Sequence, residues 1–213
     1  MSLIVRAIVR VRDVERAASD LVAIRSGDIA VLASRVGGAI AADEPELRAH
    51  HAIAARVHDA GPSLPSRFGQ VFPNEAAVES AIAARRDELV ESLERVGDRV
   101  EMAVTLTWRE APARVDAPEP RSGREFLESR AAREHERQDA ERAVERLVNE
   151  LTTERPLVRH SICPREGVAA IVAVLIDRDD VRGLRERVVA FDAHDERVEA
   201  TVSGPMPPYS FAS

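Results

Sequence analysis

Alternating apolar and polar residues predict the strands of this chain. Residues 3–12 place aliphatic side chains at the odd positions and arginines at Arg6, Arg10 and Arg12. Successive side chains of a strand point to opposite faces, so this pattern predicts a strand with one buried and one wet face. Residues 28–36 predict a second strand, and residues 98–109 predict a third with the cleanest alternation.

Between these strands, apolar residues recur at helical spacing, which predicts helices. Residues 44–59 predict a helix that ends before a Gly-Pro pair, as helices commonly do. A strand is expected at 64–72, and Asn74 is a good N-cap for a helix that continues to Val96. From residue 98 onward the expected elements are a strand at 98–109, a loop at 110–121, a helix from the capping box at Ser122 to about Thr153, strands at 157–163 and 168–176, a helix at 178–193 and a strand at 197–202.

The order from residue 98 onward is strand, helix, strand, strand, helix, strand, which is the ferredoxin-like pattern. Its first helix is longer than such a domain needs. We therefore predict an α+β protein with two domains, namely a mixed α+β N-terminal domain and a modified ferredoxin-like C-terminal domain with a long helical extension. The expected bounds are 1–97 for the first domain, 98–203 for the second with its extension at about 110–153, and 204–213 for a C-terminal tail that docks between the domains.

Composition narrows the classes of function. The 213 residues carry 30 basic side chains, all arginine, against 37 acidic ones, and the net charge of −7 argues against a nucleic-acid partner. No apolar run approaches the roughly 18 residues of a membrane span, so we expect no lipid-membrane partner and a cytoplasmic location. A single cysteine, Cys163, rules out an internal disulfide framework and is expected to be a buried structural thiol.

Few residues suggest catalysis or metal binding. His50, His51 and His58 share one expected helix, where we predict surface positions, because His51 and His58 lie about 10 Å apart and cannot grip one metal ion. The acidic cluster at 177–180 is typical of a helix N-cap rather than a magnesium site. No GxSxG or phosphate-binding loop occurs. We predict no catalytic residue, no cofactor and no metal site.

Two segments are unusual in ways that packing alone does not explain. Arg67 interrupts an otherwise apolar segment, which predicts a partly buried guanidinium with a structural partner. Tyr209 and Phe211 lie in the last residues of the sequence, where chains usually fray. Aromatic residues there predict that the tail is docked, either between the domains, which we favour, or onto a partner.

These segments resemble the GvpL/GvpF family of gas vesicle proteins. The family pattern L-P-x-R-F-G-x-V-F corresponds to residues 64–72, and G-P-x-P-P-Y-S-F corresponds to residues 204–211. Between them, a strand at 101–108 and G-R-x-[YF]-L at 123–127 stand in the family's order. The resemblance marks six residues as structural or partner-contact candidates: Arg67, Phe68, Arg124, Phe126, Tyr209 and Phe211.

The resemblance implies an accessory or minor structural role in building gas vesicles, without enzymatic activity. It implies binding to the gas vesicle shell protein, to other gas vesicle accessory proteins, or to both, and a location with the vesicles. It also implies two α+β domains joined by a C-terminal tail. The L and F types, the oligomeric state and the binding surface all stay open. The alternative function is a small ligand-binding or cofactor-free enzyme module on a ferredoxin-like fold.

Overall fold

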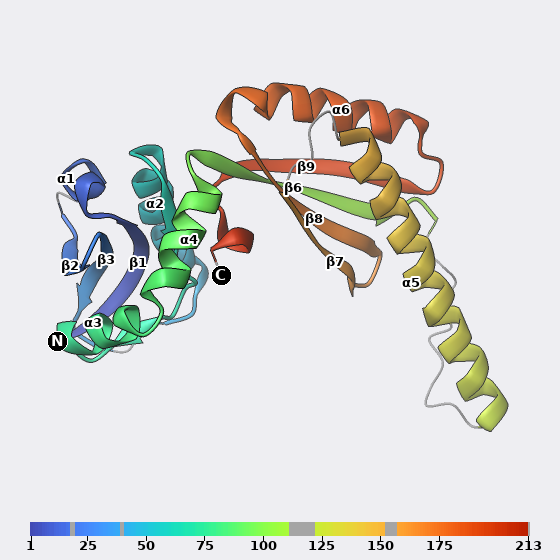
Figure 1. Ribbon diagram of the computed structural model, residues 1–213. Helices are drawn as coiled ribbons and strands as arrows, with labels where there is room; N and C mark the ends of the chain where they lie inside the picture. The colour runs from blue at the N-terminus through green and yellow to red at the C-terminus, as the bar shows by residue number, and fades with distance from the viewer. Residues whose placement is uncertain (18–19, 39–40, 111–121, 152–156, 213) are drawn as a thin grey trace. The chain divides into compact units, whose positions relative to one another are not determined.

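A computed structural model describes residues 1–17, 20–38, 41–110, 122–151 and 157–212. Its contacts divide the chain into two units, coloured by residue number in Figure 1. Unit 1 comprises Met1–Glu101 together with Met206–Ser213, and unit 2 comprises Met102–Pro205. The first unit is therefore discontinuous in sequence, because the second is inserted before its last segment.

Unit 1 is a small sheet with helices packed on it. Its strand order is β2-β3-β1-β4, and β5 pairs with another part of β1. The elements are β1 (Ser2–Arg10), α1 (Val14–Ala17), β2 (Val22–Ser26), β3 (Ile29–Val36), α2 (Glu44–Asp59), β4 (Ser63–Pro65), β5 (Val71–Phe72), α3 (Glu75–Ala83) and α4 (Arg86–Val96), with short 3₁₀ turns at Val11–Asp13 and Tyr209–Phe211.

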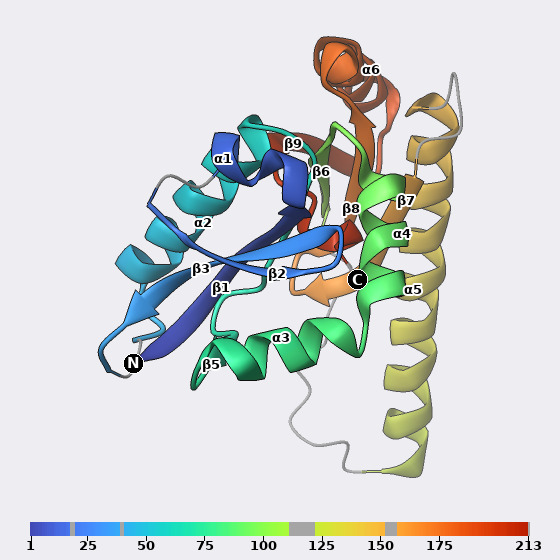
Figure 2. The same cartoon turned by 60° about the vertical axis from the view of Figure 1, so that its left-hand side comes forward.

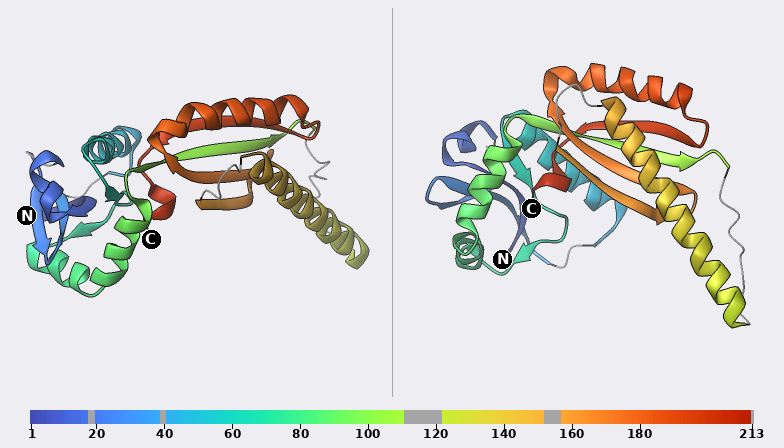
Figure 3. Two further views of the ribbon diagram at one scale, coloured as in Figure 1. Left: turned by 45° about the horizontal axis from the view of Figure 1, so that its top comes forward. Right: turned by 45° about the vertical axis from the view of Figure 1, so that its right-hand side comes forward.

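The expected wet face of β1 does not exist. This strand runs antiparallel to β3 on one side and to β4 and β5 on the other, so it lies inside the sheet. Ala7 and Val9 pack with Val57 of α2, whereas α3 and α4 lie on the opposite side of the sheet (Figures 2 and 3). Arg10 reaches Asp28 at 2.7 Å and Glu94 of α4 at 2.9 Å. The alternation predicted that the arginine face of β1 is exposed to solvent. Helix α4 covers this face instead, because Arg10 forms an ion pair with Glu94.

Three further features of unit 1 differ from the prediction. The strand expected at 64–72 is two short strands, β4 and β5, joined by a turn in which Gly69 has a φ of +88°. The helix expected up to Val96 is two helices, because the chain turns after Ala84. The sequence prediction also missed β2, although Gly27-Asp28 between two apolar runs is a typical two-residue hairpin signal.

Unit 2 follows the predicted order of elements. They are β6 (Arg99–Trp108, whose first residues belong to unit 1), α5 (Gly123–Leu151), β7 (Leu157–Arg165), β8 (Val168–Asp177), α6 (Val181–His194) and β9 (Val198–Met206), with a 3₁₀ turn at Arg178–Asp180. The strand order is β7-β8-β6-β9. The unbroken apolar run at 168–176 forms β8, an interior strand, as its composition predicts.

Helix α5 packs on the sheet only through its second half. Its buried residues begin at Ala140 and continue through Ala143, Val144 and Leu147 to Leu151, where they face α6, β7 and β8. The first half extends past the strands in Figure 3 and is held by ion pairs along the helix, such as Arg124–Glu128. The expected N-cap is confirmed, since Ser122 Oγ accepts the Glu125 N–H at 3.2 Å. Residues 111–121 and 152–153, expected as loop and helix end, lie outside the described residues.

Candidate interaction surfaces

The two most distinctive sequence segments, 64–72 and 204–211, both contact helix α2 in unit 1. His50 of α2 is buried between the turn after β4 and strand β1. Its Nε2 lies 2.8 Å from the carbonyl oxygen of Ser66, and its Nδ1 lies 2.9 Å from a guanidinium nitrogen of Arg6. Because Arg6 only donates, Nδ1 must accept and Nε2–H must donate, which fixes a neutral imidazole. Phe68 packs its ring edge-on to His50 at a centroid distance of 5.5 Å.

Arg6 reaches His50 because β1 bulges at this position. The β1–β3 register shifts between Val5 and Ala7, which leaves Arg6 as the extra residue. Its Nε donates to Ser34 Oγ at 3.1 Å, and its carbonyl accepts the Ser66 N–H. Burial lowers the pKa of Arg6. It also lowers the pKa of His50, where the charge of Arg6 acts in the same direction.

The C-terminal segment is anchored in unit 1 by three contacts. Tyr209 stacks on His51, with ring centroids 5.9 Å apart. The backbone N–H and the hydroxyl of Ser210 each donate to the Glu101 carboxylate at 2.8 Å, and Glu101 is only 4% exposed. Phe211 is buried. Burial, with Glu101 nearby, raises the pKa of Tyr209 to about 12, so its hydroxyl stays protonated.

The expectation of surface histidines on α2 is wrong for two of the three. His50 and His58 are buried, and His58 bonds Ser63 Oγ at 3.1 Å and the Arg99 carbonyl at 3.0 Å. Together with Ala54 and Val57 they occupy positions i, i+4, i+7 and i+8 of one helix face. That spacing is the signal that identifies them as inward-facing.

The six candidate residues fall into two groups. Phe68 and Tyr209 contact the α2 histidines His50 and His51, and Phe211 is buried in unit 1. Arg67 is exposed on the turn between β4 and β5, so the expectation of a partly buried guanidinium is wrong. The turn breaks the strand and directs this side chain outward. Arg124 and Phe126 begin α5 in unit 2, where Phe126 is 52% exposed.

Other polar candidates have structural partners or different surroundings. Asp177 and Asp180 make no side-chain cap hydrogen bond, contrary to the N-cap prediction. Asp180 instead pairs with Arg187 at 2.6 Å, which draws its carboxylate along the helix. Cys163 is half-buried rather than buried, because it lies at the irregular end of edge strand β7, with a φ of +45°. Among the described residues, no group of three His, Cys, Asp or Glu side chains is placed to hold a metal ion.

Comparison with known proteins identifies the group to which these segments belong. A family model described as gas vesicle synthesis protein GvpL/GvpF matches residues 7–213. The chain belongs to this family. A curated relative, gas vesicle protein F of Streptomyces sp. (strain CB03234), is 28% identical over 207 residues, which cover 87% of this chain and 84% of the relative.

Two solved structures share the fold of this GvpL/GvpF family member. The crystal structure of GvpF from Microcystis aeruginosa has a TM-score of 0.73 at 18% identity and covers 100% of this chain and 99% of that one. The crystal structure of GvpF from Anabaena sp. PCC7120 has a TM-score of 0.72 at 19% identity, with coverages of 100% and 98%. In the described ranges, no helix combines the length and apolarity needed to cross a membrane.

Proposed function

We propose that this protein is a non-enzymatic accessory or minor structural component of gas vesicle assembly. It acts by binding the shell protein, other gas vesicle accessory proteins, or both. Membership of the GvpL/GvpF family supports the role in gas vesicles. The proposal that it acts by binding rather than by catalysis rests on the contacts of the polar side chains described above.

The observation that carries this proposal is that the buried ionisable groups described above hold segments of unit 1 together. His50 joins β1 to the turn after β4, and Glu101 binds the backbone and hydroxyl of Ser210. Tyr209 remains protonated, with its pKa raised to about 12. General acid–base catalysis needs a group poised near neutral pH and accessible to substrate. These polar groups stabilise the fold, which suits a binding protein.

We also propose the domain organisation that the sequence predicts, with a ferredoxin-like second domain and a C-terminal tail at 204–213. The strand order β7-β8-β6-β9, combined with the chain order strand-helix-strand-strand-helix-strand, supports the ferredoxin-like assignment. The boundary of unit 1 at Glu101 and Met206 lies close to the proposed bounds of 97 and 204.

Co-purification from cells that produce the gas vesicle proteins tests the proposed function. The tagged chain should capture the shell protein or other accessory proteins, and deletion of its gene should abolish vesicles. Arg67→Glu and Phe126→Ala change exposed candidates without touching the core, so a loss of capture identifies a contact surface. Arg48→Glu, on the exposed side of α2, is the matched control and should leave capture unchanged. Normal vesicles in the deletion strain, with no captured protein, would overturn the proposal.

A further inference from the structure

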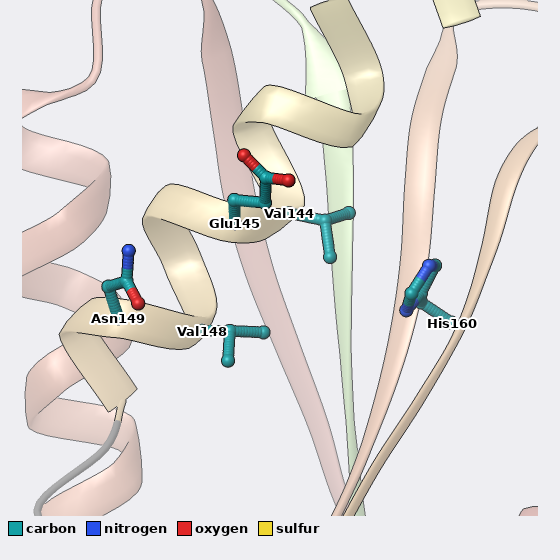
Figure 4. Close-up of a pocket in the computed structure, with 5 residues that line it drawn as sticks. All are labelled: Val144, Glu145, Val148, Asn149 and His160. Carbon is teal, nitrogen blue, oxygen red and sulfur yellow. The ribbon is translucent and has the colours of Figure 1, made fainter. Parts of the chain in front are cut away.

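The edge strand β7 and the helix α5 enclose a groove that nothing in the described parts of unit 2 fills. Its volume is about 460 Å³, and it is lined by Val144, Glu145, Val148 and Asn149 of α5 and by His160 of β7 (Figure 4). In Figure 4, Val144 and Val148 point from the helix toward the strand that carries His160. The two walls are therefore a helix face and a side chain of the edge strand β7.

Strand β7 has the properties of an edge that can accept another strand. It is nine residues long, and β8 is its one neighbour in the described sheet. Residues 157–162 pair with β8 in regular antiparallel register and contain no proline. The irregularity that natural edges use for protection occurs only at the far end, between Ile162 and Arg165. An edge strand directs one row of backbone N–H and C=O groups away from its neighbour, and a helix alongside such an edge creates a typical site for an extended peptide.

The charges of the groove indicate what the added segment carries. Glu145 is exposed on the helix wall, and within the described residues it has no ion pair or hydrogen bond. Val144 and Val148 form an apolar floor next to it. A long basic side chain matches this combination, because its methylene stem packs on apolar surface while its cationic end pairs with a carboxylate.

A second copy of the same strand fits poorly. Antiparallel edge-to-edge pairing of two β7 strands can place Arg159 of one copy opposite Arg165 of the other, and like charges on paired strands are destabilising. The side chains of β7 that lie on the same face as His160 are Val158 and Ile162, so a second copy offers no cation to Glu145.

We propose that the α5–β7 groove binds an extended segment of a partner protein as an added strand on β7. The segment places a lysine or arginine side chain across Val144 and Val148, with its cationic group on Glu145. This inference rests on the proposed function, in that the protein works by binding other proteins, and it adds the site, the binding mode and the chemistry of the bound segment.

Synthetic peptides test the groove with the full chain. The probe is a short fluorescent peptide of alternating threonine and valine with one central arginine, and its companion carries glutamate at that position. We expect the arginine peptide to bind more tightly by roughly tenfold or more, as a charged hydrogen-bonded pair predicts. Binding should slow amide exchange at residues 157–162. A peptide with proline next to the arginine, which removes a backbone donor, should bind weakly.

Three variants distinguish specific peptide binding in the groove from non-specific binding. Glu145→Arg should reverse the preference, so that the glutamate peptide binds better than the arginine peptide. Val148→Asp should weaken both. Val189→Asp, which changes a 67% exposed valine on α6, is the matched control and should alter neither. Equal affinities for the two peptides, binding without protection of β7, or an unchanged preference in Glu145→Arg would overturn the proposal.

The peptide test and the co-purification test fail independently. Peptide binding with a reversed preference in Glu145→Arg supports the groove even if no gas vesicle protein is captured, which would count against the proposed function alone. Capture of vesicle proteins together with no peptide binding would refute the groove and leave the proposed function standing.

Discussion

Replacing His50 with phenylalanine should destabilise unit 1 severely, because it removes both hydrogen bonds of a buried bridge. The substitution keeps an aromatic ring in a space that His50 fills to within 3% exposure. It leaves the guanidinium of Arg6 without its acceptor at 2.9 Å and the Ser66 carbonyl without its donor at 2.8 Å. Arg6 is itself only 6% exposed, so water replaces little of what is lost.

The size of the effect follows from the charge state of each group. A hydrogen bond to a charged partner contributes about 1.5–3 kcal/mol and a neutral one about 0.5–1.5 kcal/mol. The sum predicts a loss of about 2–4.5 kcal/mol in the free energy of unfolding. For a unit of about 100 residues, this corresponds to a fall in Tm of roughly 10–25 °C.

Urea unfolding followed by circular dichroism gives the free energies, and a second substitution makes the test specific. In Arg6→Leu/His50→Phe, no buried cation is left unpaired, so the double variant should be more stable than the sum of the two single effects predicts. Leu47→Phe, at a 46% exposed position of α2, is a control for adding a ring to the helix and should have little effect. A fully stable His50→Phe variant, or strict additivity in the double variant, would refute the role of the bridge.

Three further predictions follow from groups already described. Burial holds the pKa of His50 below its usual 6.5, so the stability that this group contributes is complete above about pH 6.5 and declines as pH falls below it. Urea midpoints at about pH 7.5 and about pH 5.5 should therefore differ less in His50→Phe than in the wild type, and an equal difference would contradict this. Ser210→Ala removes one hydrogen bond to buried Glu101 and should cost about 1.5–3 kcal/mol, whereas Ser203→Ala, at an exposed position, should cost little; equal melting temperatures would exclude the anchor. Arg67→Ala should change stability by less than about 0.5 kcal/mol, because the side chain is exposed, and a large fall in Tm would show that it has a structural partner.

The sequence predicts best those elements that have clear end signals or an unbroken apolar run. Helix α2 occupies the predicted range 44–59, since its ends carry an acidic N-cap and a Gly-Pro stop. Strand β8 is interior, as expected from an unbroken apolar run. Both signals are local, so they do not depend on which distant segment packs against the helix or strand.

The polar interior of unit 1 could not be predicted in the same way. Arg6 is buried because β1 bulges there and because α2 supplies an acceptor 44 residues away. Strict alternation places every arginine of β1 on the solvent side, because it assumes a regular strand without a bulge. Likewise, the motif at 64–72 contains Phe68 but does not indicate which residue its ring contacts. Only the fold shows that the ring packs against His50. The helical spacing of His50 and His58 identifies them as inward-facing, but it does not show which distant groups they bond.

The insertion of unit 2 before the last segment of unit 1 has a consequence for synthesis on the ribosome. Residues 1–101 emerge first, but the serine that binds Glu101 and the phenylalanine that fills the interior, Ser210 and Phe211, emerge only after all of residues 102–205. Domains usually fold as the chain leaves the ribosome, in order from the N-terminus. Here the domain that begins first must be completed last. A chain interrupted within unit 2 therefore carries an unfinished unit 1, in which the Glu101 carboxylate does not yet accept the two hydrogen bonds of Ser210.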